Sequence, residues 1–409
     1  MQESTAPNST YNLLISIIIF FTLLIACNIL SIIIAGPASL EPQGYQTSEF
    51  LINYQGGFIR RGLLGECLYS LHNITKIDPR YVIWSICVVS LLLLLYILIR
   101  RSIAKNICWY FLPLSFGLGG ADFIRKDYLC MLLILYAICL YKKNKNIIYR
   151  FINVNLILIV AINLHECVFF MIIPAFFVLF YSSTQNRTAF KYASMLPCLI
   201  MMIMVSIFKG NVHIAQTINN SWIDVYPNFK NIIITENMNF NSITAIGWDT
   251  QWAIDFHIHE NFFKKTTLAY GLLTKPINWI LIIYAVNNII FINKPVSRLN
   301  NFSNTHCFLG IMIFQFFSIL PMLTILSCDA SRVYFYWATT SLIIYLYIPQ
   351  TQIELAFPNW YKKVISYIHP YVYNRKSIFI TTLFVFGDII RYCIPRYKDF
   401  IIDITASIY

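Results

Sequence analysis

The sequence predicts an all-α protein, a polytopic integral membrane bundle of about eleven transmembrane helices joined by loops, one of them long. Of its 409 residues, 58% are hydrophobic and only 12% are charged, whereas soluble domains carry about 25% charged residues. The mean hydropathy is +0.63. Apolar runs of membrane length recur from the first twenty residues to the last forty. No segment is left for a sizeable soluble domain, so we expect residues 1–409 to form a single membrane domain.

The apolar runs define the predicted spans. The first run, residues 11–35, is too long for a signal-peptide core, and residues 1–10 contain no Lys or Arg, so we expect a retained helix. The full set of predicted spans is 12–36, 81–99, 107–121, 128–141, 147–164, 167–182, 192–208, 274–293, 306–327, 333–349 and 377–392.

The basic residues predict the orientation of these spans. Lys and Arg concentrate in alternate short loops, which the positive-inside rule assigns to the cytoplasm together with the N-terminus. The two long segments, 37–80 and 209–273, then face outward, the first carrying an interfacial helix and the second forming a lid. The formal net charge is +12, but its cations form no tract or patch. This argues against nucleic acid as a partner and favours membrane lipid and phosphate-bearing molecules.

The first outward segment contains the most informative motif, GGFIRRGLLGE. Gly56 and Gly57 permit a backbone turn, after which residues 58–71 are expected to run as the interfacial helix, with Ile59 among the side chains that face lipid. Arg60 and Arg61 would then lie at headgroup depth. Adjacent guanidinium groups suit the oxygens of a diphosphate, although they would also bind ordinary lipid phosphates.

Further polar residues interrupt the apolar runs on the same predicted face. The sequence ADFIRKDYL supplies Arg125, Lys126 and Asp127 beside a short hairpin. These residues would form a salt-bridged cap, or Arg125 would act as a second phosphate-binding cation. Glu49 and Glu66 of the first outward segment are additional polar candidates.

Two pairs of polar residues each contain a carboxylate that is a candidate for acid–base chemistry. His165 and Glu166 break an apolar stretch from residue 147 to residue 180, and they form either a tight outer turn or a polar pair at membrane depth. A partly desolvated Glu166 would have a raised pKa and would act as a base near neutral pH. Asp329 and Arg332 are spaced as a helical-turn salt bridge, with Asp329 as an alternative base.

No motif predicts a cofactor. The HIHE sequence at 257–260 is weak as a metal site, because a His-x-His pair shares a face only in an extended strand. No Walker loop, GxSxG or GxGxxG motif is present. We therefore expect neither metal nor nucleotide, and an enzyme of this kind would need a substrate that is already activated, such as a lipid diphosphate.

The order of these motifs resembles the bacterial O-antigen and surface polysaccharide polymerases, which are polytopic membrane glycosyltransferases of envelope glycan assembly, including lipopolysaccharide. The resemblance covers the whole chain in layout. It implies transfer of a growing glycan from undecaprenyl diphosphate to an incoming lipid-linked repeat unit, on the periplasmic face of the inner membrane. The lipid-linked glycan and the membrane lipid are the implied partners, with a chain-length regulator protein as a further candidate.

The resemblance also implies roles for individual residues. Glu166 or Asp329 would be the base that deprotonates the acceptor hydroxyl, with His165 as an alternative proton acceptor. Aromatic residues of the long loop, among them Trp248, Trp252 and Tyr226, would stack on sugar rings or simply pack together. Cations on the outer face would hold the diphosphate and offset the charge of the leaving group: Arg60, Arg61, Arg125 and Arg332.

Two other classes of protein fit part of the pattern. A C-type membrane glycosyltransferase would use an undecaprenyl monophosphate sugar donor, but that family usually carries an acidic pair in its first outer loop, where Glu49 is accompanied only by Glu41. A lipid-glycan transporter or flippase would carry charged residues at the bilayer midplane and inverted repeats. The predicted helix centres here are almost wholly apolar.

Overall fold

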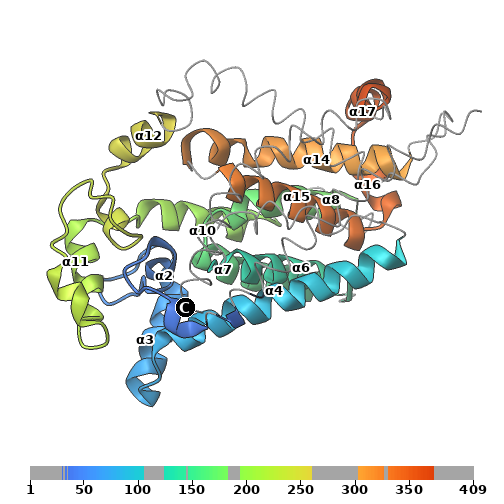
Figure 1. The fold of residues 1–409 in the computed structure, drawn as a ribbon. Helices are drawn as coiled ribbons and strands as arrows, with labels where there is room; N and C mark the ends of the chain where they lie inside the picture. The colour runs from blue at the N-terminus through green and yellow to red at the C-terminus, as the bar shows by residue number, and fades with distance from the viewer. Residues whose placement is uncertain are drawn as a thin grey trace, which may run out of the picture.

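The computed structural model describes residues 36–105, 124–143, 146–182, 194–259, 303–326 and 330–372, together with residues 30, 33 and 34. Every regular element in these segments is a helix, and the longer helices run side by side as a bundle (Figure 1). The all-α prediction is confirmed for this part of the chain. Four predicted spans, 12–36, 107–121, 274–293 and 377–392, lie wholly or almost wholly outside the described residues.

Seven helices form the described bundle, and each overlaps a predicted span. In order they are α4 (Pro79–Ala104), α6 (Asp127–Lys143), α7 (Ile147–Leu164), α8 (Val168–Tyr181), α10 (Leu196–Ile207), α14 (Asn304–Pro321) with its π-helical continuation η5 (Met322–Leu326), and α15 (Ala330–Tyr347).

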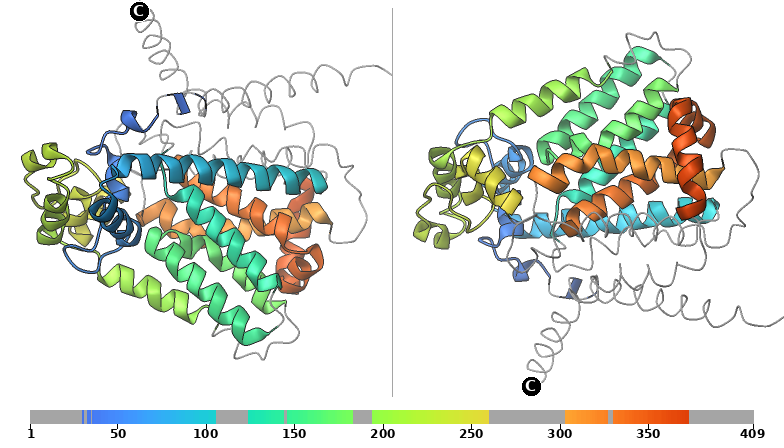
Figure 2. Two further views of the ribbon diagram at one scale, coloured as in Figure 1. Left: turned by 90° about the horizontal axis from the view of Figure 1, so that it is seen from below. Right: turned by 90° about the horizontal axis from the view of Figure 1, so that it is seen from above.

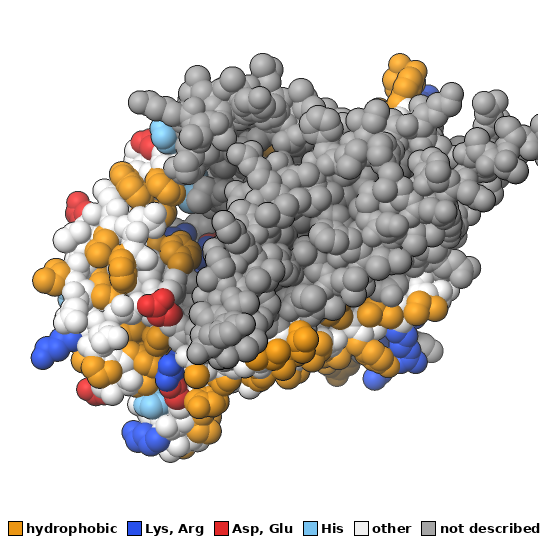
Figure 3. All heavy atoms as spheres, in the orientation of Figure 1, with side chains coloured by type: hydrophobic (Ala, Val, Ile, Leu, Met, Phe, Trp, Pro, Cys, Tyr) orange, Lys and Arg blue, Asp and Glu red, His pale blue; other side chains and the backbone are white. Residues whose placement is uncertain are grey.

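Length and composition make the described bundle compatible with a membrane. Among the described residues, three helical segments are long and apolar enough to cross a bilayer: α4, α7 and Asn304–Leu326. The bent pair of α10 and α11 (Val212–Ser221), which turns by 93°, makes a fourth if it is counted as one span. Along α4 the outer flank presents hydrophobic side chains in a continuous row (Figure 3). A membrane protein is thus supported, although fewer spans are described than the eleven predicted.

Basic side chains close one end of the bundle, where α4, α6 and α15 all terminate. Lys105 Nζ donates to the carbonyl of Tyr345 at 2.7 Å, and Lys142 Nζ donates to the carbonyl of Tyr347 at 3.0 Å. The guanidinium of Arg101 lies 5.1 Å from the ring centre of Tyr347. Cations at helix C-termini satisfy carbonyls that have no partner within the helix.

Two short helices, α16 (Gln350–Ala356) and α17 (Asn359–Val372), follow at this basic end. Helix α17 lies across the bundle axis (Figures 1 and 2). It buries Ile365 against the bundle, whereas Trp360 and Tyr367 are exposed. An amphipathic helix that crosses the bundle axis and exposes aromatic residues has the character of an interfacial helix.

The opposite end of the bundle is covered by a cap built from the two long segments that the sequence predicts to face outward. The cap comprises η1 (Pro37–Ser39), α2 (Tyr45–Phe50), α3 (Gly62–Thr75), α11, η2 (Pro227–Asn231), η3 (Thr244–Gly247) and α12 (Thr250–Ile258). The two segments are joined by hydrogen bonds: Trp222 Nε1 donates to the Leu51 carbonyl at 2.7 Å, and Asn53 Nδ2 donates to Ser221 Oγ at 2.8 Å. They therefore fold together over one end of the helices.

Helix α3 differs from the interfacial helix predicted for residues 58–71. It begins at Gly62, because Arg61 takes the left-handed conformation with φ 64° and so ends the preceding turn. Ile59, which we expected to face lipid, is fully buried. The two arginines consequently lie in the turn before α3 and not on its surface.

We predict that Gly65→Ala destabilises the cap. A Cβ at this position would come within 1.8 Å of the Ile52 carbonyl oxygen, so the backbone of one segment must shift. Overpacking of this kind costs about 1–3 kcal/mol or more, which would lower the apparent Tm of the purified protein in detergent. Ser70→Ala, at an exposed position on the same helix, is the matched control and should leave the Tm unchanged. An equal Tm for the two variants would contradict this close packing.

Candidate functional site

Charged residues from four separate segments converge where the cap meets the bundle. They belong to the first long segment (α2 and the turn before α3), the start of α6, the junction of α7 and α8, and α15. We call this group the ion network, and its members are Glu49, Arg60, Arg61, Lys126, Asp127, His165, Glu166 and Arg332.

Arg61 forms the first of two bidentate ion pairs in the ion network. Its Nε and Nη2 donate to the two carboxylate oxygens of Glu166 at 2.7 and 2.5 Å. Lys126 Nζ donates to the Arg61 carbonyl at 3.1 Å, which helps to hold Arg61 in its left-handed conformation. Such a conformation is unfavourable for a residue with a Cβ, and it persists only where surrounding contacts impose it.

Arg332 forms the second bidentate pair, with Asp127. Its Nε and Nη2 lie 2.8 and 2.7 Å from the two Asp127 oxygens, and the Tyr336 hydroxyl also donates to Asp127. Asp127 was one of two expected partners for Arg125, the other being Asp122, and the hydrogen bonds of Asp127 reach α15. Arg125 is half-buried directly before Lys126, and its carbonyl accepts a hydrogen bond from the Cys87 thiol at 3.7 Å.

Glu49 lies between the two bidentate pairs and connects them. Its Oε1 is 3.6 Å from Arg61 Nη1, 3.5 Å from Arg332 Nη2 and 3.4 Å from His165 Nε2. The residue is only 3% exposed. Burial alone would raise the pKa of Glu49, but the charges of Arg332 and Arg61 outweigh burial and hold the pKa well below its usual range. Glu49 is therefore an ionised carboxylate held by arginines on two sides.

His165 ends α7 in an extended conformation and turns the chain toward α8. Its Nδ1 accepts a hydrogen bond from the Cys167 backbone N–H at 3.3 Å, so a neutral ring carries its proton on Nε2, facing Glu49. Burial, with the charges of Arg61 and Arg332, lowers the pKa of His165 to about 3. The imidazole is thus neutral at physiological pH, and its Nδ1 lone pair is already engaged.

Glu166 is the most exposed carboxylate of the ion network, with 17% of its side chain accessible. Burial raises its pKa, but Arg61 and the neighbouring charges prevail and hold the pKa well below the ordinary value. The prediction of a raised pKa is therefore wrong for Glu166 as long as it is paired with Arg61.

The ion network contains more positive than negative charge. Four cations (Arg60, Arg61, Lys126, Arg332) face three carboxylates (Glu49, Asp127, Glu166), which leaves one positive charge in excess. Arg60 is the most accessible of these cations: its side chain is 36% exposed, and its Nη1 lies a loose 3.8 Å from Glu166 Oε1. The site can therefore accept a further anion with little loss of existing contacts.

Lys126 contributes its charge from full burial. It packs with Nζ 5.6 Å from the ring centre of Phe50, and burial lowers its pKa to about 8, a shift that the charge of Glu49 partly offsets. The group is still largely protonated at neutral pH.

An aromatic cluster formed by α12 and by Trp248, two residues before it, lies near the arginines. Trp248 contacts Trp252 at 4.7 Å and Phe256 at 5.4 Å between ring centres. Burial and the charges of Arg60 and Arg61 together lower the pKa of the adjacent His257 to about 4. The second long segment thus brings aromatic rings near Arg60 and Arg61.

Other predicted residues lie elsewhere. Glu66 accepts hydrogen bonds from Tyr54 N at 2.8 Å and from Gln55 Nε2 at 3.0 Å, so it supports the turn before the arginines. Tyr226, considered for sugar stacking, donates to Asp78 at 2.7 Å and packs within the cap. Asp329 lies outside the described residues.

The contact between Tyr336 and Asp127 was not predicted, although the sequence contains a signal for it. Tyr336 follows Arg332 by one helical turn, so the two side chains share a face of α15 and both reach Asp127. Among the described residues no group of three or more His, Cys, Asp and Glu side chains is placed to hold a metal ion.

Comparison with known proteins leaves the family open. No protein-family model matches the chain, and no curated protein and no solved structure is similar to it. The function is therefore inferred from the geometry and charge of the site.

We predict that Asp127→Asn strongly destabilises the protein. The substitution removes the bidentate partner of the largely buried Arg332, and breaking a buried pair costs about 3–5 kcal/mol because one charge remains uncompensated. The apparent Tm should fall sharply. Asp255→Asn, on the exposed face of α12, is the control and should leave Tm unaltered. A Tm for Asp127→Asn equal to that of the control would show that the pair is not formed.

We also predict a pH-dependent contribution from Lys126. Its pKa is near 8 in the folded chain and 10.5 in the unfolded chain, so between these values the unfolded state binds the extra proton and stability rises with pH. The Lys126→Met variant lacks this titrating ammonium group. The Tm of the wild type relative to that of Lys126→Met should therefore increase from about pH 7.5 to about pH 9.5. A constant or decreasing difference would mean that Lys126 is not buried as a charge.

Proposed function

We propose that the chain is a membrane glycosyltransferase of the polymerase type, which transfers a growing glycan from undecaprenyl diphosphate to an incoming lipid-linked repeat unit. The observation that carries this proposal is the convergence of Arg60, Arg61, Lys126 and Arg332 at one end of an apolar helical bundle. A substrate with a long apolar chain and an anionic headgroup matches both parts of that arrangement.

The arginines are suited to the diphosphate of the donor. Arg60 presents an accessible guanidinium, and the excess positive charge of the ion network favours an anion beside it. Guanidinium groups bind phosphate oxygens in a bidentate manner. As the bond between the anomeric carbon and the diphosphate breaks, negative charge grows on the leaving oxygen, where fixed cations lower the energy of the transition state.

Glu166 is the described carboxylate best placed to serve as the base. Arg61 holds Glu166 ionised, but a diphosphate that engages Arg60 and Arg61 would draw their charge away. The desolvation of Glu166 would then dominate and raise its pKa toward the range of a general base. It would take the proton of the acceptor hydroxyl while that oxygen attacks the anomeric carbon. Asp329 remains an alternative base, and His165, whose Nδ1 is engaged, suits the positioning of Glu49 better than proton transfer.

The orientation of the site follows from the two ends of the bundle. The end opposite the ion network ends in Arg101, Lys105, Lys142 and Lys143, and the positive-inside rule favours the cytoplasm for such an end. The cap and the ion network would then face the periplasm of a bacterial inner membrane, with the N-terminus in the cytoplasm. The aromatic cluster of the cap would meet the sugar rings there.

One observation favours the alternative of a C-type glycosyltransferase with an undecaprenyl monophosphate donor. Glu49, the acidic residue of the first outward segment, lies at the centre of the ion network and not apart from it. In this alternative Glu49 would be the base, and the same arginines would hold a single phosphate. The two readings differ in product, because a polymerase lengthens the glycan and a decorating transferase adds single sugars.

We predict that Arg60→Ala strongly reduces polymerisation but does not prevent folding. A hydrogen bond to a charged group contributes about 1.5–3 kcal/mol, so activity should fall roughly 10- to 100-fold, and the host should display single repeat units in place of long chains. Arg80→Ala, whose guanidinium pairs with Asp78 outside the ion network, is the matched control. Polysaccharide gels and membrane immunoblots provide the readout. Long chains of normal abundance in the Arg60→Ala strain would contradict the proposal.

A further inference from the structure

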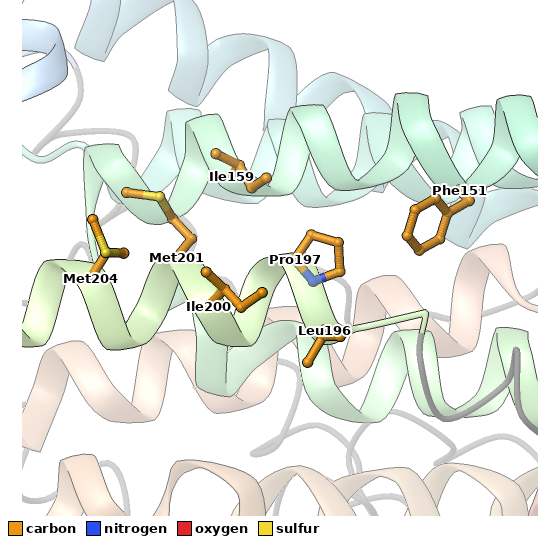
Figure 4. A pocket seen from close by; sticks show the side chains of 7 residues that line it. All are labelled: Phe151, Ile159, Leu196, Pro197, Ile200, Met201 and Met204. Atoms are coloured by element: carbon orange, nitrogen blue, oxygen red, sulfur yellow. The ribbon is translucent and has the colours of Figure 1, made fainter.

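An apolar groove lies between α7 and α10, and the function proposed above leaves it unassigned. It has a volume of about 420 Å³ and is lined by Phe151 and Ile159 of α7 and by five side chains of α10 between Leu196 and Met204 (Figure 4). Small-molecule sites commonly have volumes of roughly 300–1,000 Å³. All the lining residues are apolar, so the groove suits a hydrocarbon ligand.

The groove is open toward the surroundings of the bundle. Helix α10 lies at the outer edge of the described bundle in both views of Figure 2, and Leu196 and Ile200 are half-exposed. Beneath the groove the two helices are joined by polar contacts: Asn155 Nδ2 donates to the Ser194 carbonyl at 3.0 Å, and the Cys198 thiol donates to Asn155 Oδ1 at 3.2 Å. These contacts hold α10 against α7, so the groove is a fixed feature of the pair.

Both helices that form the groove lead to the ion network. Helix α7 runs on from Ile159 to its end two residues before Glu166, about 8 Å at the helical rise, and α10 runs on from Met204 to its end just before Phe208, about 5 Å. The Phe208 carbonyl accepts a hydrogen bond from the backbone N–H of Arg60 at 3.2 Å. A molecule lying along the groove would therefore have one end beside Arg60 and Glu166.

We propose that this groove binds the polyisoprenoid chain of the lipid-linked substrate, with the phosphate groups held by Arg60 and Arg61. The inference rests on the proposed function and specifies where its substrate enters the bundle. Charge complementarity selects this occupant, because the two helices that line the apolar groove lead toward an excess of positive charge. The thioethers of Met201 and Met204 can adjust to branched isoprene units.

The test uses full-length protein in phospholipid nanodiscs and two probes. One is undecaprenyl phosphate with a photoreactive group in its chain, and the other is geranyl diphosphate, which is too short to fill the groove. Ile200→Trp fills the groove, whereas Ile203→Trp, half-exposed on the same helix but outside the lining, is the control. We expect labelling within residues 151–159 and 196–204. We also expect Ile200→Trp to weaken long-chain binding at least about tenfold, as displacement of buried methylene groups predicts, with geranyl diphosphate binding unchanged.

The possible results separate the two proposals. Labelling elsewhere, an equal effect of Ile200→Trp and Ile203→Trp, or full displacement of the long-chain probe by phosphatidylcholine would overturn the groove assignment, while Arg60-dependent binding of geranyl diphosphate would leave the proposed function intact. Geranyl diphosphate binding that is unchanged in Arg60→Ala would instead contradict the phosphate site itself.

Discussion

The burial of charge at the junction of cap and bundle constrains the rest of the structure. A carboxylate or guanidinium removed from water is costly unless an opposite charge and hydrogen bonds compensate it. Glu49 is almost fully buried, and its charge is compensated by Arg61 of its own segment and by Arg332 of α15, with His165 of the α7–α8 junction beside it. The ion network thus fixes the position of the segment that carries the two arginines, and the cap cannot move away from the helices without leaving charges unpaired.

The same network links fold to function. Its bidentate pairs order Arg61 and Arg332, while Arg60 remains accessible and only loosely paired. In the proposed mechanism a phosphate that reaches Arg60 would compete with Glu166 for the neighbouring guanidinium, so substrate binding would also activate the base. Helices α7 and α10, which line the apolar groove, lead toward this point, so the proposed lipid-linked donor would lie along them with its phosphates beside the cations.

Much of this arrangement was predictable from the sequence, because membrane helices and the residues that interrupt them have strong signals. The runs around α4, α7 and α14 and the break at His165 and Glu166 follow directly from hydropathy. Local spacing was a poor guide to pairing. It suggested partners within three residues, whereas Asp127 pairs with Arg332, which is 205 residues away. Long-range pairs depend on how helices pack, and one sequence contains little information on that.

Backbone conformation and local electrostatics were also beyond the sequence. The left-handed Arg61 starts α3 later than the apolar pattern suggested, and its stabilisation comes in part from Lys126 on another segment. The lowered pKa of Glu166 also depends on a contact between distant segments. Burial alone would raise this pKa, and the charge of Arg61 reverses the shift.

The most direct test is an experimental map of the protein in nanodiscs with undecaprenyl diphosphate bound. The predicted result is diphosphate density in contact with Arg60 and Arg61, beside Glu166 and at the end of the bundle that carries the cap. Density for the diphosphate at the basic end, or a map in which Arg61, Glu49 and Arg332 lie far apart, would contradict the central claim.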